Sequence, residues 1–385
     1  MDMSAEIDFS NLPKQAVPLF VLSPRRILAD ILSKGWVEGA IPFLALSCVV
    51  IGILLTTEDY FAPANLRNLA QYAADGGLVV LALLIVVAVG GIDLSVGSNF
   101  AMSAFAALFC FHILDLPVPA VLGVSLATGA LIGSVNGILA GLIGCGALLA
   151  TLGTMITTRG LFTLASQAQL VEISTSARVD DLWDWVGFEK LLSMPIGFWI
   201  WLLVAILVFV MFRQTRLGWH ILAVGGNRKA ARHGGIQVKT TAFLAYTLAG
   251  LIVGLAGFLF AARQNSIGAD TGIGLEFFAL TALVVGLGGF VPGRGPVVAV
   301  MIGFATVYIL NNVLINAGFR GDFVQFSLGA IIVVIIAIDV KFQCRMRWHQ
   351  GCAGPRSWPR ANWTGRKMCC WMLPAISIAG RGTAA

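Results

Sequence analysis

The chain has 385 residues, of which 58% are apolar and only 11% are charged. In soluble proteins about a quarter of all residues are charged, so a water-soluble enzyme of this length is excluded. The net charge of +6 does not indicate a nucleic-acid-binding protein, because the charges lie between long apolar runs, as in a polytopic membrane protein. The seven cysteines form no CxxC pair, so neither a disulfide scaffold nor a zinc site is predicted.

The first 35 residues contain charged side chains such as Asp2, Lys14 and Arg26. They have no compact apolar core followed by a small-residue cleavage site, which a secretory signal peptide requires. We therefore expect residues 1–35 to form a cytoplasmic N-terminal segment.

Charge-free runs predict the membrane-spanning helices of a transmembrane domain at residues 36–341, because a spanning helix needs about 20 apolar residues. The run 116–158 is long enough for two helices, and small residues between Gly141 and Gly146 divide it. The second of these helices continues past Arg159. The predicted fold is all-α with ten spans, in the runs 39–57, 76–92, 94–114, 116–158 (two spans), 191–212, 240–262, 277–293, 295–319 and 323–338.

The distribution of Lys and Arg predicts the orientation, because cytoplasmic loops of membrane proteins are enriched in both residues. With ten spans and a cytoplasmic N-terminus, 19 of the 25 basic residues fall on the cytoplasmic side. The loop 167–193 has more acidic than basic residues, as an extracytoplasmic loop can. We therefore expect a multi-pass membrane protein with both termini in the cytoplasm.

A weak internal similarity relates residues 81–98 to residues 279–296. Three glycines of the first segment, Gly90, Gly91 and Gly97, align with three of the second. Transporters are often built from two such halves, so the similarity predicts two pseudo-repeated halves. Two glycine-rich helix ends of similar composition are the alternative.

The segment GGIDLSVGS, from Gly90 to Ser98, ends the second predicted span. It places Asp93 and Ser95 among three glycines beside the bilayer core. Irregular backbone at membrane depth requires protein or water to satisfy its polar groups. The segment therefore predicts an inward-pointing break, at a pathway or a helix junction. A cytoplasmic turn in which Asp93 caps the third span is the alternative.

Uncharged polar side chains occur inside predicted spans four, five and nine, where they are costly against lipid and should face protein or a cavity. Amide and hydroxyl groups suit a neutral polyol, and interhelical hydrogen bonding is the alternative explanation. The candidates for a translocation path are Asp93, Ser95, Asn136, Thr151, Thr154, Asn311 and Asn312. Arg159, near the outer end of span five, is expected to reach the interface or to pair with the loop 167–193.

The connection 213–239 is the only predicted cytoplasmic loop long enough to hold a helix. Asn227 is a plausible N-cap for a helix at residues 228–232, and glycines follow as a C-terminal stop. A short helix with small residues can lie across the groove of a partner protein. A positively charged anchor on the inner surface is the alternative. The residues singled out are Gly225, Gly226, Asn227, Ala230, Ala231, Gly234 and Gly235.

No catalytic constellation is apparent, because the four histidines are scattered and no Walker A sequence GxxxxGK[ST] occurs. We therefore expect no enzyme activity and no cofactor or metal bound by this chain. Energy for transport would come from a partner.

Four segments, in their order and spacing, resemble the membrane permeases of bacterial ATP-binding-cassette sugar importers of the ribose, xylose, arabinose and galactose branch. The resemblance covers about residues 40–341. The segments are GGIDLSVGS at 90–98, TLGTMITTRG at 151–160, TRLGWHILAVGGNRKAARHGGI at 215–236 and VVGLGGFVPGRGP at 284–296.

The resemblance implies a homodimeric permease, a periplasmic sugar-binding protein as donor and a pair of cytoplasmic ATPase subunits that use ATP and Mg. It also implies that the loop from Gly225 to Ile236 couples the permease to the ATPase. No nucleic-acid partner is implied. The tail 342–385, basic and rich in Trp and Cys, resembles nothing in that family. An altered reading frame or an appended segment is expected there, and a membrane-surface anchor is the alternative.

Two other function classes are alternatives to this interpretation. An ion-coupled secondary transporter or channel for a small polar solute would carry paired carboxylates at the centre of its spans. A membrane-embedded enzyme would need an acid–base pair. The predicted spans hold no acid at their centres, which favours the ATP-driven permease.

Overall fold

The structure is a computed structural model of the chain. It describes residues 62–175, 178–287 and 295–316, together with residues 47, 50–52, 60, 292, 293, 318, 319, 323, 326, 329, 330 and 333. The predicted N-terminal segment 1–35 and the tail 342–385 lie outside the described residues.

The described elements are almost all helical. In chain order they are α3 (Pro63–Ala88), α4 (Val96–His112), α5 (Val118–Asn136), η2 (Gly137–Ile143), α6 (Ala147–Thr175), α7 (Asp181–Phe188), β1 (Lys190–Leu191), β2 (Met194–Pro195), α8 (Ile196–Gln214), α9 (Arg216–Gly226), α10 (Arg228–His233), α11 (Val238–Gln264), α12 (Leu275–Leu287) and α13 (Val297–Asn316). Helix η2 is a π-helical continuation of α5. The strands β1 and β2 pair as an antiparallel hairpin.

Within the described residues, six helices are long and apolar enough to cross a membrane: α3, α5 with η2, α6, α8, α11 and α13. Two shorter apolar helices, α4 and α12, stand at the predicted third and eighth spans. The chain is therefore an all-α, multi-pass membrane protein, as the sequence predicts. The first and tenth predicted spans lie largely outside the described residues, so the count of ten stays a prediction.

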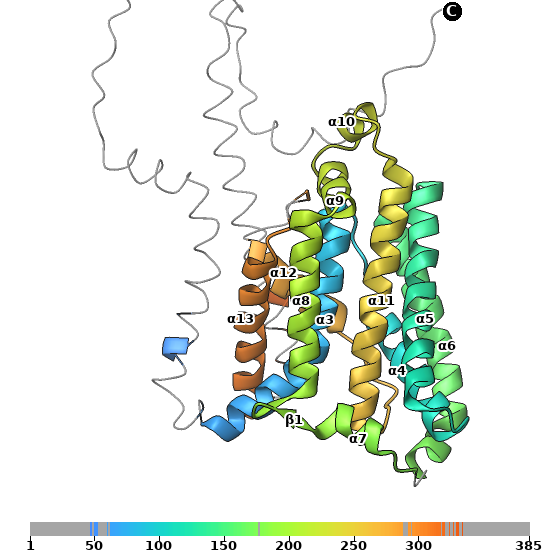
Figure 1. Ribbon diagram of the computed structural model, residues 1–385, viewed down its shortest axis with the longest axis vertical. Helices are drawn as coiled ribbons and strands as arrows, with labels where there is room; N and C mark the ends of the chain where they lie inside the picture. Colours follow the sequence, from blue (N-terminus) through green and yellow to red (C-terminus); the bar gives the residue numbers. More distant parts are fainter. Residues whose placement is uncertain are drawn as a thin grey trace, which may run out of the picture.

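The long helices run side by side between two ends of the bundle (Figure 1). One end carries α9 and α10, and the other carries α7 and the β1–β2 hairpin. We call the end with α10 the inner end, because it holds the basic loop 213–239, and the end with α7 the outer end.

The helix boundaries depend on glycine and proline residues more than on the ends of the charge-free runs. Gly144, at φ +90°, ends η2, so the run 116–158 is divided at the predicted glycine cluster. Helix α3 begins at Pro63, earlier than the predicted start at residue 76, and contains the charged residue Asp75. That charge is tolerated because Asp75 forms a buried ion pair with Arg263, at the outer end of α11.

Helix α3 lies at the centre of the bundle, in contact with α8, α11, α12 and α13. Every residue from Leu78 to Val89 is at most 1% exposed. A helix that is apolar on all sides is typical of a span enclosed by other spans.

Helices α5 and α11 pack closely through glycines. A β-carbon on Gly129 would overlap the carbonyl oxygen of Gly250, and one on Gly254 would lie 2.6 Å from that of Ser125. Glycines at four-residue spacing bring helix backbones together in membranes, where apolar burial between helices contributes little. This contact was not predicted, although the four-residue spacing of Gly129, Gly133 and Gly137 is visible in the sequence.

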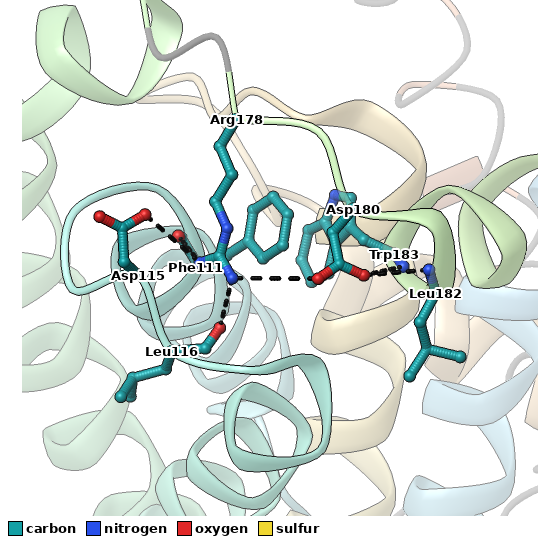
Figure 2. A network of polar contacts seen from close by, with 7 residues as sticks. All are labelled: Phe111, Asp115, Leu116, Arg178, Asp180, Leu182 and Trp183. Carbon is teal, nitrogen blue, oxygen red and sulfur yellow. Dashed lines mark hydrogen bonds and ion pairs between the residues drawn. The ribbon is translucent and has the colours of Figure 1, made fainter.

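A polar network closes the outer end around Arg178 (Figure 2). Its guanidinium donates to the carbonyl oxygens of Phe111 and, at 2.9 Å, of Leu116, where α4 ends. It also pairs with Asp115 at 3.6 Å and Asp180 at 4.0 Å. Asp180 in turn caps α7, so one side chain joins the α4–α5 turn to the start of α7.

Candidate translocation and coupling sites

The segment after α3 leaves the helix at Gly90. The N–H groups of Gly90 and Gly91 donate to the carbonyls of Val87 and Val86, and Gly90 has φ +84°. This left-handed cap favours glycine. From there the chain continues without regular structure to Ser95, where α4 begins.

A polar cluster lies inside this break. Asp93 is 4% exposed, and Ser95 and Asn136 are fully buried. The Asp93 carboxylate accepts from the backbone N–H of Ser95 at 2.8 Å and from its hydroxyl at 2.7 Å. The Asn136 amide donates to the Ser95 hydroxyl at 2.7 Å and approaches both Asp93 oxygens at 3.4 Å. The protein thus satisfies the Asp93 carboxylate and the Ser95 hydroxyl, whereas the buried amide oxygen of Asn136 has no hydrogen-bond partner in the described part of the chain.

The backbone of the break is bonded to neighbouring helices as well. The carbonyl oxygen of Ile92 accepts from the Tyr246 hydroxyl of α11 at 3.2 Å and from the Thr151 hydroxyl of α6 at 3.4 Å. The segment is therefore a helix junction enclosed by α5, α6 and α11. The alternative of a turn in which Asp93 caps α4 is wrong, because Ser95 occupies the N-cap and no side chain caps the helix.

The structure brings together four of the seven path candidates: Asp93, Ser95, Asn136 and Thr151. Thr154 lies one turn further along α6 and donates to the carbonyl of Ala150 on its own helix. Asn311 and Asn312 lie apart from the cluster, near the outer end of α13. Asn312 accepts from the Tyr60 hydroxyl at 2.9 Å, whereas Asn311 makes no side-chain hydrogen bond within the described ranges. Whether any of them contacts a solute stays a prediction.

Arg159 does not pair with the loop 167–193 in the part of the chain that the structure describes. Instead its guanidinium donates to the carbonyl of Thr271, in the connection between α11 and α12, at 2.6 Å. That connection returns from the outer end toward the start of α4. It brings Glu276, in the first turn of α12, against Gly97 of α4. Glu276 was not predicted as a site residue, because it borders the charge-free run 277–293, which is long enough for one full span.

The loop at the inner end has the predicted local structure. Helix α10 spans Arg228–His233, and the Asn227 side chain accepts from the N–H groups of Lys229 and Ala230 at 3.0 and 3.1 Å. Gly234 follows as the C-cap, and Gly235 has φ +81°. The capped short helix is therefore confirmed, while its role as the coupling element stays a prediction.

The two alanines of α10 face different ways. Ala231 is 6% exposed and packs on the chain's own core, whereas Ala230 is exposed. The free surface of the helix therefore consists of basic side chains and Ala230, and Ala231 is not available to a partner.

The loop is also fixed to the bundle at the end of α9. A β-carbon on Gly225 would overlap the carbonyl oxygen of Ala88, the last residue of α3. The same carbonyl accepts from the N–H of Gly293 at 3.1 Å, and Gly293 lies against Gly226. The Arg228 guanidinium reaches the carbonyl of Gly90 at 3.4 Å. The ends of α3 and α9 and the turn before α13 thus meet at one point.

This arrangement defines a class of protein. Long apolar helices, a satisfied break of irregular backbone inside the bundle and an exposed basic helix at one end are typical of a multi-pass membrane transport subunit.

Comparison with known proteins gives the family. The chain belongs to the family described as the permease component of branched-chain amino acid transport systems, which matches residues 65–336. The ribose import permease protein RbsC of Escherichia coli K12 is 30% identical over 313 residues, which cover 81% of this chain and 96% of RbsC.

Two further relatives come from the same strain. The D-allose transport system permease protein AlsC is 29% identical over 78% of this chain and 90% of its own length. The probable ABC transporter permease protein YphD is 32% identical over 76% of this chain and 88% of its own length. No solved structure matches the chain. Members of this family are transport subunits rather than enzymes.

Proposed function

We propose that the chain is the permease subunit of an ATP-binding-cassette importer that moves a neutral monosaccharide across the bacterial inner membrane. The observation that carries the proposal is the similarity to RbsC, which extends over nearly the whole length of that ribose permease. The similarity to AlsC supports a monosaccharide as cargo.

The partners follow from this class of transporter. A periplasmic sugar-binding protein would deliver the sugar at the outer end, and two copies of the chain would form a homodimer. A cytoplasmic ATPase pair, using ATP and Mg, would dock at the inner end with both chain termini on that side. The exposed helix α10 supports this, because it directly follows the end of α9, which is packed against the end of α3 and the turn before α13.

The ATPase contact would involve the surface residues of the loop. Asn227 sets the direction of α10, and Gly226, Gly234 and Gly235 are exposed beside it. A motion of α10 would reach Ala88 directly through Gly225 and thereby the break that follows α3.

An ion-coupled secondary transporter is the second candidate, and one observation favours it. The buried Asp93 carboxylate has no basic partner among the described residues, and such a group could carry a proton or hold a cation. In the importer the same carboxylate is held by three donors as part of the helix junction.

Reconstitution in proteoliposomes tests the proposal. The purified permease with its ATPase inside, and the binding protein outside, should accumulate radiolabelled D-ribose or D-allose only when ATP is enclosed. An ionophore that dissipates proton and sodium gradients should leave this uptake unchanged. Uptake without ATP that the ionophore abolishes would support the secondary transporter instead.

A further inference from the structure

Two shortened helices start at the same place in the bundle. Helix α4 has 17 residues and α12 has 13, which correspond to lengths of about 25 and 20 Å. Neither reaches the roughly 30 Å thickness of the bilayer core. A β-carbon on Gly97 of α4 would overlap the Gly272 carbonyl, and one on Gly272 would overlap that of Gly97, so the start of α4 contacts the connection that leads directly into α12.

Two charged side chains flank this contact at mid-depth. Arg159 lies twelve residues after Ala147, the start of α6 at the inner end, which places it about 18 Å along the helix. Glu276 lies eleven residues before Leu287, the inner end of α12, a distance of about 17 Å. An acid therefore does lie near the centre of the membrane, contrary to the expectation from charge-free runs.

The Arg159 side chain has unused hydrogen-bonding capacity. It is partly exposed, and among the described residues it makes one hydrogen bond, to the carbonyl of Thr271. A guanidinium has five N–H donors, so four remain without a described protein partner. The ring of Phe162, 5.4 Å from the guanidinium carbon, supports the group from its own helix.

Glu276 is partly exposed as well. Its carboxylate lies against Gly97 and near the N–H groups of Gly274 and of Glu276 itself. It attracts Arg159, but the two side chains form no direct ion pair in the described part of the chain. The Glu276 carboxylate and the Arg159 guanidinium are thus near each other, and both keep hydrogen-bonding capacity for a further partner.

Partly exposed charges at this depth cannot face lipid without a large cost, so they should face water or protein. We infer that Arg159 and Glu276 line a hydrated route at the meeting point of α4 and α12 and hydrogen-bond the hydroxyl groups of the passing monosaccharide. A guanidinium and a carboxylate supply the donors and acceptors that a polyol loses when it leaves water. The inference rests on the proposed function and names two contact residues for it.

Transport by three variants in the reconstituted complex tests the inference. R159M and E276Q remove the charge at similar size, and K190M removes an exposed charge from the β1–β2 hairpin as a control. We expect R159M and E276Q to lower D-ribose uptake about tenfold or more, as expected for a lost hydrogen bond to a charged group. Complex yield and the melting temperature of E276Q should stay near wild type, R159M should lose only the stability of its hydrogen bond to Thr271, and K190M should transport normally.

Thiol accessibility provides a readout that needs no transport. With the native cysteines replaced, a cysteine at Ile273, which is 57% exposed beside Gly272, should react with a hydrophilic methanethiosulfonate. D-ribose should slow the reaction. A cysteine at Leu203, 56% exposed on the apolar surface of α8, should stay unreactive.

Three results would overturn the inference. The first is an unreactive cysteine at Ile273. The second is a loss of complex yield and melting temperature in R159M and E276Q that parallels the loss of uptake, because the pair would then only brace α12. The third is normal uptake in both variants. A wild-type complex that imports no sugar, with a reactive and unprotected cysteine at Ile273, would refute the proposed function but retain the hydrated route.

Discussion

The guanidinium carbon of Arg178 lies 4.2 Å from the centre of the Phe111 ring. Trp183 of α7 stacks on the same ring at 4.1 Å, with the two planes within 8° of parallel. The Trp183 indole also donates to Asn265, just after α11, at 2.6 Å. Phe111 thus links the end of α4 to α7 and α11, and Arg178 holds this contact closed at the outer end.

Replacing Arg178 should therefore loosen the outer end. R178A removes charge-assisted hydrogen bonds to two helix-end carbonyls, and we expect a loss of about 2 to 3 kcal/mol in the free energy of unfolding. R178K should be intermediate, because an ammonium lacks the planar fork. Thermal unfolding of the purified protein measures the effect, with K190A as the exposed control. Equal melting temperatures for R178A and K190A would contradict the role of the network.

Asn136 should act as a brace of the helix junction. In N136L the Ser95 hydroxyl and the Asp93 carboxylate lose their amide donor, and we expect a loss of about 0.6 to 2 kcal/mol, seen as a lower melting temperature and expression level. N311L is the matched control, because Asn311 makes no side-chain hydrogen bond within the described ranges. Lost uptake by N136L at an unchanged melting temperature would instead assign Asn136 to the wall of the path.

Substitutions of the two adjacent glycines at the end of α9, Gly225 and Gly226, should have different effects. G225A places a methyl group on the Ala88 carbonyl, so we expect poor assembly, whereas G226A adds one into open space and should be tolerated. The larger G226V should leave membrane insertion intact but uncouple ATP hydrolysis from sugar uptake. Comparing ATPase and uptake rates in proteoliposomes measures this. Wild-type coupling in G226V would count against α10 as the ATPase contact.

Single cysteines at the two ends of the bundle test the orientation. Leu192, at the tip of the hairpin, is 79% exposed at the outer end, and Lys229 is exposed on α10. In a background without native cysteines, L192C should react with an impermeant thiol reagent on intact cells. K229C should react only after lysis. Reversed labelling would refute the orientation and the cytoplasmic ATPase site together.

The glycine contact between α5 and α11 can be tested within one helix. G129A drives a methyl group into the Gly250 carbonyl and should lower the melting temperature and yield sharply. G123A on the same helix faces open space and should be neutral or slightly stabilising, because Ala is the better helix former. Similar stability of the two variants would show that the close contact contributes little.

Local signals in the sequence predicted a good part of this structure. The pair Gly225–Gly226 followed by Asn227 predicted a capped short helix, because the capping asparagine bonds within its own turn. The division of 116–158 was predicted from the small residues between Gly141 and Gly146, of which Gly144 takes the left-handed conformation that ends η2. The long apolar runs predicted the all-α fold.

Contacts between distant segments could not be predicted in this way. A prediction from charge-free runs ends a span at every charged residue. It therefore began this span after Asp75, although Asp75 forms a buried ion pair with Arg263 and α3 begins at Pro63. The position of Glu276 at mid-depth depends on how the α11–α12 connection folds back. The predicted internal similarity is compatible with the helix ends at Ala88 and Leu287, but the two pseudo-repeated halves stay a prediction.

The interlocked glycines also restrict how α5 and α11 can move. Sliding α11 by two or three residues, about 3 to 4.5 Å, would bring bulkier neighbours of Gly250 and Gly254 against the backbone of α5. Helices α5 and α11 can therefore move together as a rigid body, but they cannot slide past each other. A switch between outward-open and inward-open states would then move the helices packed against this pair, α3, α4 and α6, relative to one rigid unit.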